Sequence, residues 1–176
     1  EALDLLREQI TAHQIDCDWQ DGYLGLATTA GKGADLQAWA DRTEKVYGYP
    51  LQRIGPEDIG RWISSPRFHS GIHDPRSGHM HPLKYTLGLA RAAAAAGVRI
   101  HEQSPVTALR QGPQPVLLTS HGQVQAKQVL LAANVYLNGL APTLATRIMP
   151  VGTYIACSEV LPADLARSLI PSQAAV

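Results

Sequence analysis

The chain has 176 residues, 15 basic and 15 acidic side chains, and no net formal charge. Because no cluster of Lys or Arg occurs, the sequence argues against a nucleic acid or an anionic membrane surface as partner. No apolar run approaches the roughly 20 residues of a transmembrane helix, and no signal peptide is visible, so we expect a cytoplasmic protein.

The two cysteines, Cys17 and Cys157, show no CxxC spacing. We therefore expect reduced core thiols rather than a disulfide. The first residue, Glu1, opens directly into a helical pattern, and residues 172–176 end without a helix cap. Both ends suggest a piece cut from a longer protein.

The first half of the chain predicts helices alternating with short strands. Apolar side chains at Leu3, Leu6 and Ile10 predict a helix over 2–14. Asp21-Gly22 predicts a two-residue hairpin turn, because both turn positions need positive φ. The other expected elements are strands at 15–19, 23–28, 51–54 and 68–73, helices at 31–47 and 56–62, and a turn at 74–78. The GKG sequence at 31–33 is expected to begin a helix rather than a phosphate loop.

The clearest helix runs over 82–96. Pro82 suits the first helical position, His81 the N-cap region, and Gly97 the position after the end. A strand at 98–101 would follow, as in a βαβ unit. The remaining expected elements are a meander of strands at 106–110, 116–120 and 123–125, strands at 129–133 and 147–159, and a helix at 163–169.

Residues 129–133 are almost wholly apolar, which suits a strand buried on both faces of a parallel sheet. This strand would end in Ala132-Ala133-Asn134, and small residues there would permit the close approach of a dinucleotide. An ordinary βαβ unit without a ligand explains these residues equally well.

Two other kinds of site are less favoured. His69, His73, His79 and His81 lie close together in the sequence, but no cysteine or carboxylate completes a metal-ligand set, so we expect no metal. Ser, His and Asp side chains occur around 70–79, but no GxSxG elbow exposes a serine nucleophile. No complete GxGxxG, Walker or HExxH motif is present.

Four segments in this order resemble the D-amino-acid oxidase (DAO) superfamily of FAD-dependent amine oxidases, and within it the gamma-glutamylputrescine oxidase branch. They are IDCDWQDGYLGLAT at 15–28, GIHDPRSGHMHPLKYTLGLARAAAAAGVRIHEQSPVTAL at 71–109, QVLLAANVYLNGLAP at 128–142, and IMPVGTYIACSEVL at 148–161.

The resemblance implies an α+β or α/β fold, the central fragment of a two-domain DAO-type flavoprotein. Part of an FAD-binding βαβ layer would join a mixed or antiparallel substrate-domain sheet with helices. Residues 15–75 and 147–176 would form a discontinuous substrate-binding domain. Residues 76–146 would be the middle of the FAD-binding domain, and 1–14 a connecting helix.

The resemblance also implies contacts with FAD. Val106 matches the residue whose backbone faces the adenine end. Ala132, Ala133 and Asn134 match the small-residue turn near the diphosphate, where the family more often has glycine in place of Asn134. Asn tolerates positive φ better than most residues. The family's opening GxGxxG strand, the acidic residue that binds the ribose and the closing glycine-rich loop are not in this sequence, so we expect the fragment to be inactive and not to retain FAD.

The parent enzyme would oxidise a primary or secondary amine, passing hydride equivalents to the flavin. The imine product would hydrolyse to an aldehyde. Strands at 23–28, 68–73 and 151–157 would face the substrate. The candidate residues are Tyr23, His73 and Tyr154, for each of which a purely structural role is the alternative.

Two rival interpretations remain. An amino-acid oxidase or dehydrogenase of the same fold, acting on glycine, sarcosine or a D-amino acid, would need arginines for the substrate carboxylate, and Arg67 and Arg76 are candidates. The second rival interpretation is a binding module without catalytic activity. A GxGxxG motif within about 30–60 residues upstream would favour an oxidase.

Overall fold

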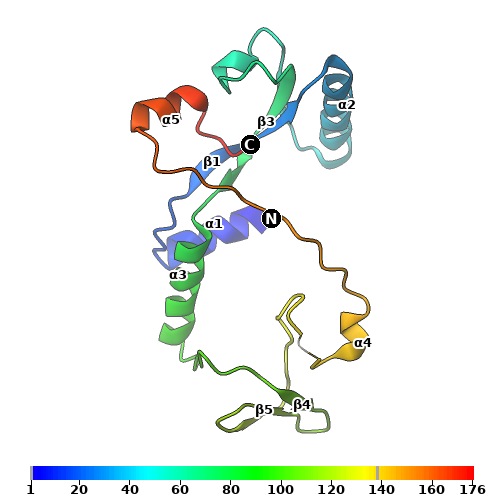
Figure 1. Cartoon of the computed structure of the whole chain (residues 1–176), viewed down its shortest axis with the longest axis vertical. Coiled ribbons are helices and arrows are strands. Elements are labelled where there is room, and N and C mark those ends of the chain that lie inside the picture. Colours follow the sequence, from blue (N-terminus) through cyan, green and yellow to red (C-terminus); the bar gives the residue numbers. More distant parts are fainter. Residues whose placement is uncertain (1, 138) are drawn as a thin grey trace. The chain divides into compact units, whose positions relative to one another are not determined.

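The structure, a computed structural model, describes residues 2–137 and 139–176. Its contacts divide the chain into two compact units (Figure 1). Unit 1 contains the residues up to Val98 together with Ser158–Val176, and unit 2 contains Arg99–Cys157. Both units hold a small antiparallel sheet, which confirms the α+β fold. No helix of the described ranges is long and apolar enough to cross a membrane.

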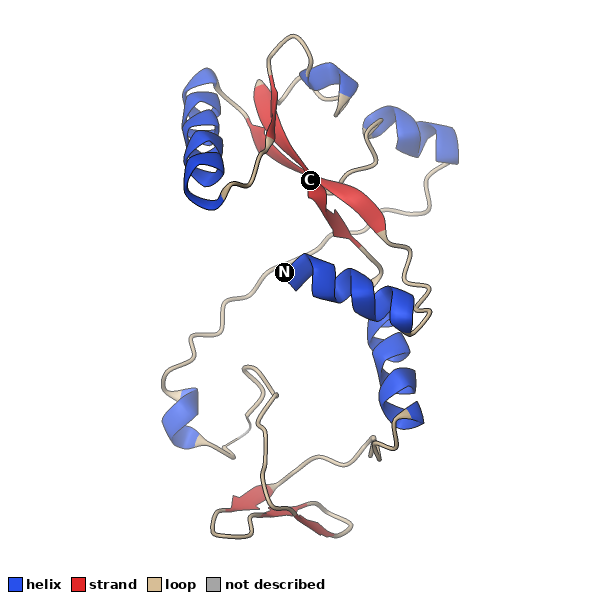
Figure 2. Cartoon of the chain, turned by 180° about the vertical axis from the view of Figure 1, so that it is seen from behind, coloured by secondary structure: helices blue, strands red, loops and turns tan. Residues whose placement is uncertain are grey.

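Unit 1 is built on an antiparallel sheet in the order β1-β3-β2 (Figure 2). The strands are β1 (Gln20–Ala27), β2 (Gln52–Ile54) and β3 (Ser70–His79). Near the chain's end, Ala175 forms a parallel bridge with Tyr23 and extends the sheet beyond β1.

Apolar side chains cover both faces of this sheet. On one face, Ile72 of β3 packs with Ala40 of helix α2 (Ala30–Tyr47) and with Leu51. On the other face a second cluster includes the short 3₁₀ helix η1 (Ile59–Arg61) and a residue near the chain's end; its members are Leu24, Ile54, Ile59, Ile63 and Ala174. The sheet is therefore the centre of the unit 1 core.

A capping side chain begins helix α2, and a glycine ends it. The side chain of Thr29 accepts a hydrogen bond from the backbone N–H of Lys32, and Gly48 ends the helix in the left-handed region at φ +61°. The GKG sequence lies in the first turn of this helix, as predicted. Gly33 lets the helix approach Ser70 closely, because an added Cβ would collide with the serine hydroxyl.

Unit 1 contains two further helices, α1 (Ala2–Ala12) and α3 (Pro82–Ala95). The segment between α1 and β1 contacts α3: Ile15 is buried against Gly88, which has no room for a Cβ, and the N–H of His81 donates to the carbonyl of Cys17 at 2.8 Å. Lys84 and Asp18 form an ion pair at 2.7 Å. These contacts fix the start of α3 against the entry to β1.

The predicted ends of α3 are confirmed. The side chain of His81 caps the helix by accepting from the N–H of Lys84, and Gly97 follows the helix at φ +89°. Cys17 is buried, as expected for a core thiol, but Cys157 is exposed, so that part of the prediction is wrong.

Both turns predicted in the first half of the chain are wrong, and so is the strand at 15–19. β1 continues through Asp21-Gly22, and β3 continues through 74–78. Asp21 pairs with Gly78, and Tyr23 pairs with Asp74, so Pro75–Ser77 stand opposite Gly22 alone. This is a β-bulge. Gly22 and Asp74 have properties that are typical of turns, but here they form a bulge. Gly22 has φ +104°, and the Asp74 carboxylate accepts from the N–H groups of Arg76 and Ser77.

Unit 2 contains the predicted meander. Its strands β4 (Ala108–Arg110), β5 (Val116–Leu118) and β6 (Gln123–Gln125) pair antiparallel in chain order. A short helix α4 (Pro142–Ala145) follows, and α5 (Ala163–Leu169), in unit 1, confirms the last predicted helix.

The strands predicted at 98–101, 129–133 and 147–159 are not formed. A strand exists only by hydrogen bonding to a neighbour, and no strand of the described residues pairs with these segments. Many of their apolar side chains are exposed, Leu130 to 90% and Ile155 to 89%, whereas Val129 and Leu131 are partly buried. The apolar pattern predicted burial that these segments do not have in this chain.

The bulge predicts the effect of replacing Gly22. Its φ is +104°, and an added Cβ would lie 3.0 Å from both His73 Nε2 and Ala174 Cβ. Gly22→Ala should therefore lower the free energy of unfolding by about 1–3 kcal/mol, measured by urea denaturation. Gly31→Ala is the matched control: it meets nothing within 4 Å and lies in α2, so it should leave stability unchanged or raise it by up to about 1 kcal/mol. Equal stability of the Gly22→Ala variant and the original chain would contradict this account.

Candidate substrate and cofactor sites

The three candidate substrate residues are divided between the two units. Tyr23 and His73 belong to the unit 1 sheet, whereas Tyr154 belongs to unit 2 and is 96% exposed. In the sheet Tyr23 pairs with Asp74, and Leu24 pairs with His73. Because neighbouring residues of a strand point to opposite faces, Tyr23 and His73 lie on opposite sides of the sheet. The predicted substrate-facing strand at 151–157 is not formed.

His73 is half-buried among polar and aromatic groups. Its Nδ1 lies 3.3 Å from Gln52 Oε1 on the paired strand β2, and its ring centroid lies 4.5 Å from that of Trp62. Burial lowers the pKa of His73, and the nearby charge of Asp74 offsets this only in part. The side chain therefore favours the neutral imidazole, which can accept a proton.

A cavity of about 430 Å³ opens beside Gln52 and Trp62. Arg53, Arg61 and Ser172 line it together with Ile54 and Pro171, so its wall combines polar and apolar groups. The Ser172 hydroxyl donates to the carbonyl of Trp62 at 3.0 Å, which holds the residues before Ala174 against η1. The sequence did not single out Gln52 or Trp62, because their proximity to His73 depends on sheet register and on the course of the chain after β2.

Asp74 is the centre of a hydrogen-bond network on the opposite face. The Tyr49 hydroxyl lies 2.9 Å from both carboxylate oxygens. Burial raises the pKa of Asp74, but the hydrogen bonds from Tyr49 and from the backbone of Arg76 and Ser77 outweigh it, so the pKa lies below its ordinary value. Burial and the Asp74 carboxylate raise the pKa of Tyr49. At neutral pH Asp74 is thus charged and Tyr49 is protonated. The Asp-Pro sequence was the signal for this network, although it was interpreted as a turn.

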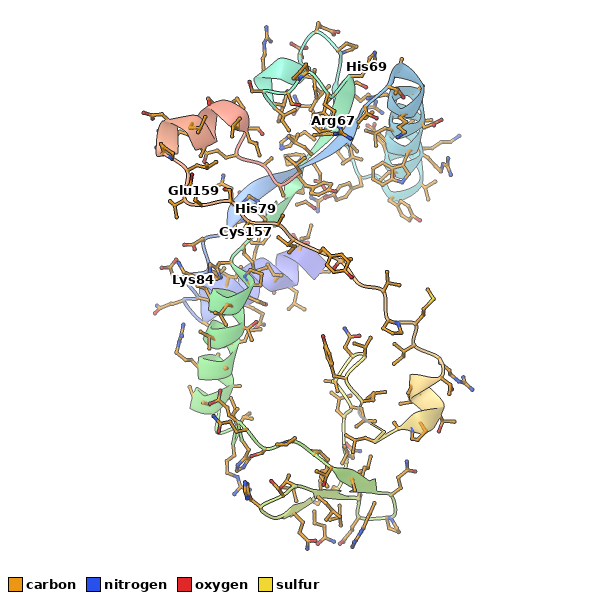
Figure 3. All side chains as sticks on the ribbon, viewed as in Figure 1. Arg67, His69, His79, Lys84, Cys157 and Glu159 are labelled. Carbon is orange, nitrogen blue, oxygen red and sulfur yellow. The ribbon has the colours of Figure 1, made fainter. Side chains whose placement is uncertain are left out.

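The two arginines considered for a substrate carboxylate differ in their surroundings. The guanidinium of Arg76 lies over the Tyr49 ring, 4.8 Å from its centroid, and the backbone carbonyl of Arg76 accepts from Arg7 at 2.9 Å. Arg67 is exposed in the loop before β3, beside His69 (Figure 3). Only Arg76 is held in place by neighbouring side chains of the described residues.

The histidines that suggested a metal alternative have separate roles. His69 Nδ1 lies 3.2 Å from the Ser70 hydroxyl, His73 contacts Trp62, and His81 caps α3. His69 and His79 lie at opposite ends of β3 (Figure 3). Within residues 2–137 and 139–176, no group of three or more His, Cys, Asp or Glu side chains is placed to hold a metal ion.

The residues matched to FAD lie in unit 2. Val106 borders a cavity of about 460 Å³ whose apolar wall includes Leu117 and Val124 and whose polar residues include Thr119 and His121. An apolar hollow with a few polar groups suits a planar aromatic ring. The hollow at Val106 would thus offer an apolar surface to the adenine end of the cofactor.

The small-residue segment at 132–134 forms a turn. Asn134 has φ +51°, the left-handed conformation that glycine more often provides. The Ala133 carbonyl accepts from the N–H of Tyr136 at 2.9 Å, which closes the turn. Ala132 and Ala133 add only methyl groups beside this backbone, so an approaching diphosphate would meet little steric hindrance. The replacement of glycine by Asn134 is thus compatible with the turn.

Comparison with known families gives the class of the protein. The FAD dependent oxidoreductase (DAO) family matches residues 1–175. The chain belongs to this family.

Individual relatives agree with this assignment. Gamma-glutamylputrescine oxidoreductase of Escherichia coli (strain K12) is 38% identical over 169 residues, which cover 96% of this chain and 40% of the relative. Probable oxidoreductase OrdL of Haemophilus influenzae is 34% identical over 176 residues, 97% of this chain and 41% of the relative. The chain thus spans about two-fifths of the length of these relatives.

Solved structures support the fold. Glycine oxidase from Geobacillus kaustophilus matches with a TM-score of 0.69 and 23% identity, over 80% of this chain and 39% of that one. L-proline dehydrogenase from P. horikoshii matches with a TM-score of 0.69 and 18% identity, over 80% and 38%. At these identities the likeness concerns the fold alone.

The surroundings of His73 predict a pH dependence of stability. Burial lowers the folded-state pKa below the ordinary value of 6.5, so the unfolded chain binds the proton more readily. The free energy of unfolding therefore keeps its full value, as far as His73 is concerned, above pH 6.5. It falls as the pH decreases from there to the folded-state pKa of His73. His73→Gln should therefore reduce the loss of unfolding free energy between roughly pH 7.5 and 5.5, measured by urea denaturation at each pH. The same pH dependence in the variant and the original chain would rule this out.

Proposed function

We propose that the chain forms part of an FAD-dependent oxidoreductase that oxidises an amine carrying a carboxylate, with gamma-glutamylputrescine as the leading substrate. The observation that carries the proposal is the 38% identity to gamma-glutamylputrescine oxidoreductase over 96% of the chain. Two more distant relatives, dimethylglycine dehydrogenase and 4-methylaminobutanoate oxidase, at 29% identity each, are also named for compounds that combine an amine with a carboxylate.

We assign residues 15–75 and 147–176 to a substrate-binding domain, 76–146 to the middle of an FAD-binding domain, and 1–14 to a connecting helix. The antiparallel sheet of β1, β2 and β3 supports the first assignment, since nearly all of it lies in 15–75. The meander and the turn at Asn134 support the second. Helix α3, which packs against Ile15 in unit 1, would be the first part of the FAD-binding domain beyond the sheet.

In this proposal FAD, when bound, accepts the hydride equivalents that the amine gives up. Val106 would hold the adenine end, and Ala132, Ala133 and Asn134 would leave space for the diphosphate. Tyr23, His73 and Tyr154 remain the candidates for contact with the substrate. A neutral His73 would suit this chemistry, because it can accept the proton of an ammonium group and leave the amine nitrogen with its lone pair.

We also propose that these 176 residues alone neither retain FAD nor turn over substrate. In the part of the chain that the structure describes, the strand expected beside the diphosphate at 129–133 is not formed, and Leu130 is exposed. The absorption spectrum of the purified chain after incubation with FAD and gel filtration should therefore contain essentially no flavin bands. Stoichiometric FAD in that spectrum would contradict this proposal.

The activity itself can be tested in a chimera. This chain would replace the matching 40% of Escherichia coli gamma-glutamylputrescine oxidoreductase. We expect the chimera to bind FAD and to be reduced anaerobically by gamma-glutamylputrescine, measured as bleaching of the flavin absorption. The unmodified enzyme is the positive control. A chimera that holds FAD but is reduced only by glycine, sarcosine or a D-amino acid would favour the amino-acid oxidase alternative, and one reduced by no amine would refute the proposal.

A further inference from the structure

Arg76 lies in the bulge of β3, and its backbone is fixed from two directions. Its N–H donates to the Asp74 carboxylate at 2.9 Å, and its carbonyl accepts from the Arg7 guanidinium of α1, also at 2.9 Å. Asp74 is itself held by Tyr49 at 2.9 Å. The position of the Arg76 Cα is therefore set by three other side chains.

The side chain of Arg76 is oriented as well. Its guanidinium stacks on the face of Tyr49, 4.8 Å from the ring centroid. Such stacking covers one face of the planar group and leaves its N–H edges available. Because the Tyr49 hydroxyl is bound to Asp74, the ring beneath the guanidinium cannot rotate away without loss of that hydrogen bond.

Arg76 also differs from the other arginines near the sheet in its partners. Arg7, Arg53 and Arg61 each form an ion pair with an aspartate. Within the described ranges, no acidic side chain forms an ion pair with Arg76, although Asp4 of α1 lies within electrostatic range. Arg76 is exposed. A charged, planar and oriented donor of this kind matches the geometry of a carboxylate.

We propose that Arg76 is a specificity-determining residue that binds the carboxylate of the amine substrate. The site is the arginine patch, which we define as Arg76, Tyr49 and Tyr23; Tyr23 lies on the same face because it pairs with Asp74. The inference rests on the proposed function for the nature of the substrate. This inference gives the bulge a role in substrate recognition. The bulge places Arg76 over Tyr49, a position that a residue of a regular strand would not take.

The test is a titration of the ¹⁵N-labelled 176-residue chain, followed by NMR of the arginine Nε–Hε groups. The probe is 4-(methylamino)butanoate, and N-methylbutylamine, which lacks the carboxylate, is the control ligand. The first should shift the Arg76 Nε–Hε signal and the backbone signals of 74–77 with one saturating Kd. The second should leave them unchanged.

Two variants sharpen the test. Arg76→Gln should raise the Kd of the carboxylate probe about tenfold or more, the usual range for loss of a hydrogen bond between charged groups. Arg42→Gln is the matched control, because Arg42 is also an exposed arginine but lies on α2; the Kd of this variant should equal that of the original chain.

Equal shifts with both probes, no shift at Arg76, or an equal rise of Kd in both variants would overturn the assignment of Arg76. The outcome is distinguishable from failure of the proposed function. A chimera that oxidises the amine while Arg76 ignores the carboxylate would leave the function standing and remove this role. Specific binding at Arg76 together with no amine oxidation would leave the role of Arg76 standing and refute the proposed function.

Discussion

The hydrogen bonds to the Asp74 carboxylate determine how unit 1 is arranged. They hold three residues of β3 opposite Gly22 and allow the two strands to continue on either side of the bulge. Tyr49, which follows α2, and Arg7, on α1, both reach the same few residues. Segments distant in sequence thus converge on the bulge: Tyr49 donates to the Asp74 carboxylate, and Arg7 donates to the carbonyl of Arg76. Since a charged group is costly to bury without partners, the network is stable only while each of these donors is in place.

The bulge also separates two functions of the sheet. Between Ser70 and the bulge, β3 packs with α2 on one face and with the cluster around Leu24 on the other, so this part forms the core. Beyond it, β3 ends at His79 and the chain enters α3, whose start is tied to Asp18 and Cys17. The core half is apolar, and the far half is polar and exposed. Polar residues that are exposed and available for recognition therefore lie at and beyond the bulge, whereas His73, before the bulge, is half-buried beside Trp62.

Local chemistry made much of this predictable from sequence. Helix periodicity, the His81 cap and Gly97 placed α3 almost to the residue, and the glycine and proline positions placed the meander. What failed depended on distant partners. Asp21-Gly22 and Asp74-Pro75 were correctly recognised as unusual backbone, but only their pairing with each other makes them a bulge. The apolar pattern at 129–133 predicts a buried strand, yet a strand requires a neighbour that no local pattern supplies. The sequence singled out His73 as a candidate but not its neighbours Gln52 and Trp62, because they reach it through the tertiary fold.

The arithmetic of the bulge limits how this part of the gene can change in length. Between the pairs Asp21–Gly78 and Tyr23–Asp74, β3 advances by four residues and β1 by two, so the excess is an even number. Side chains therefore keep the same inside-outside alternation on both sides of it. Loss or gain of one codon between Pro75 and Ser77 would change the loop that the Asp74 carboxylate holds through the N–H groups of Arg76 and Ser77. It would also shift Gly78, which has no room for a Cβ beside Trp19, so that a residue with a side chain could take its place.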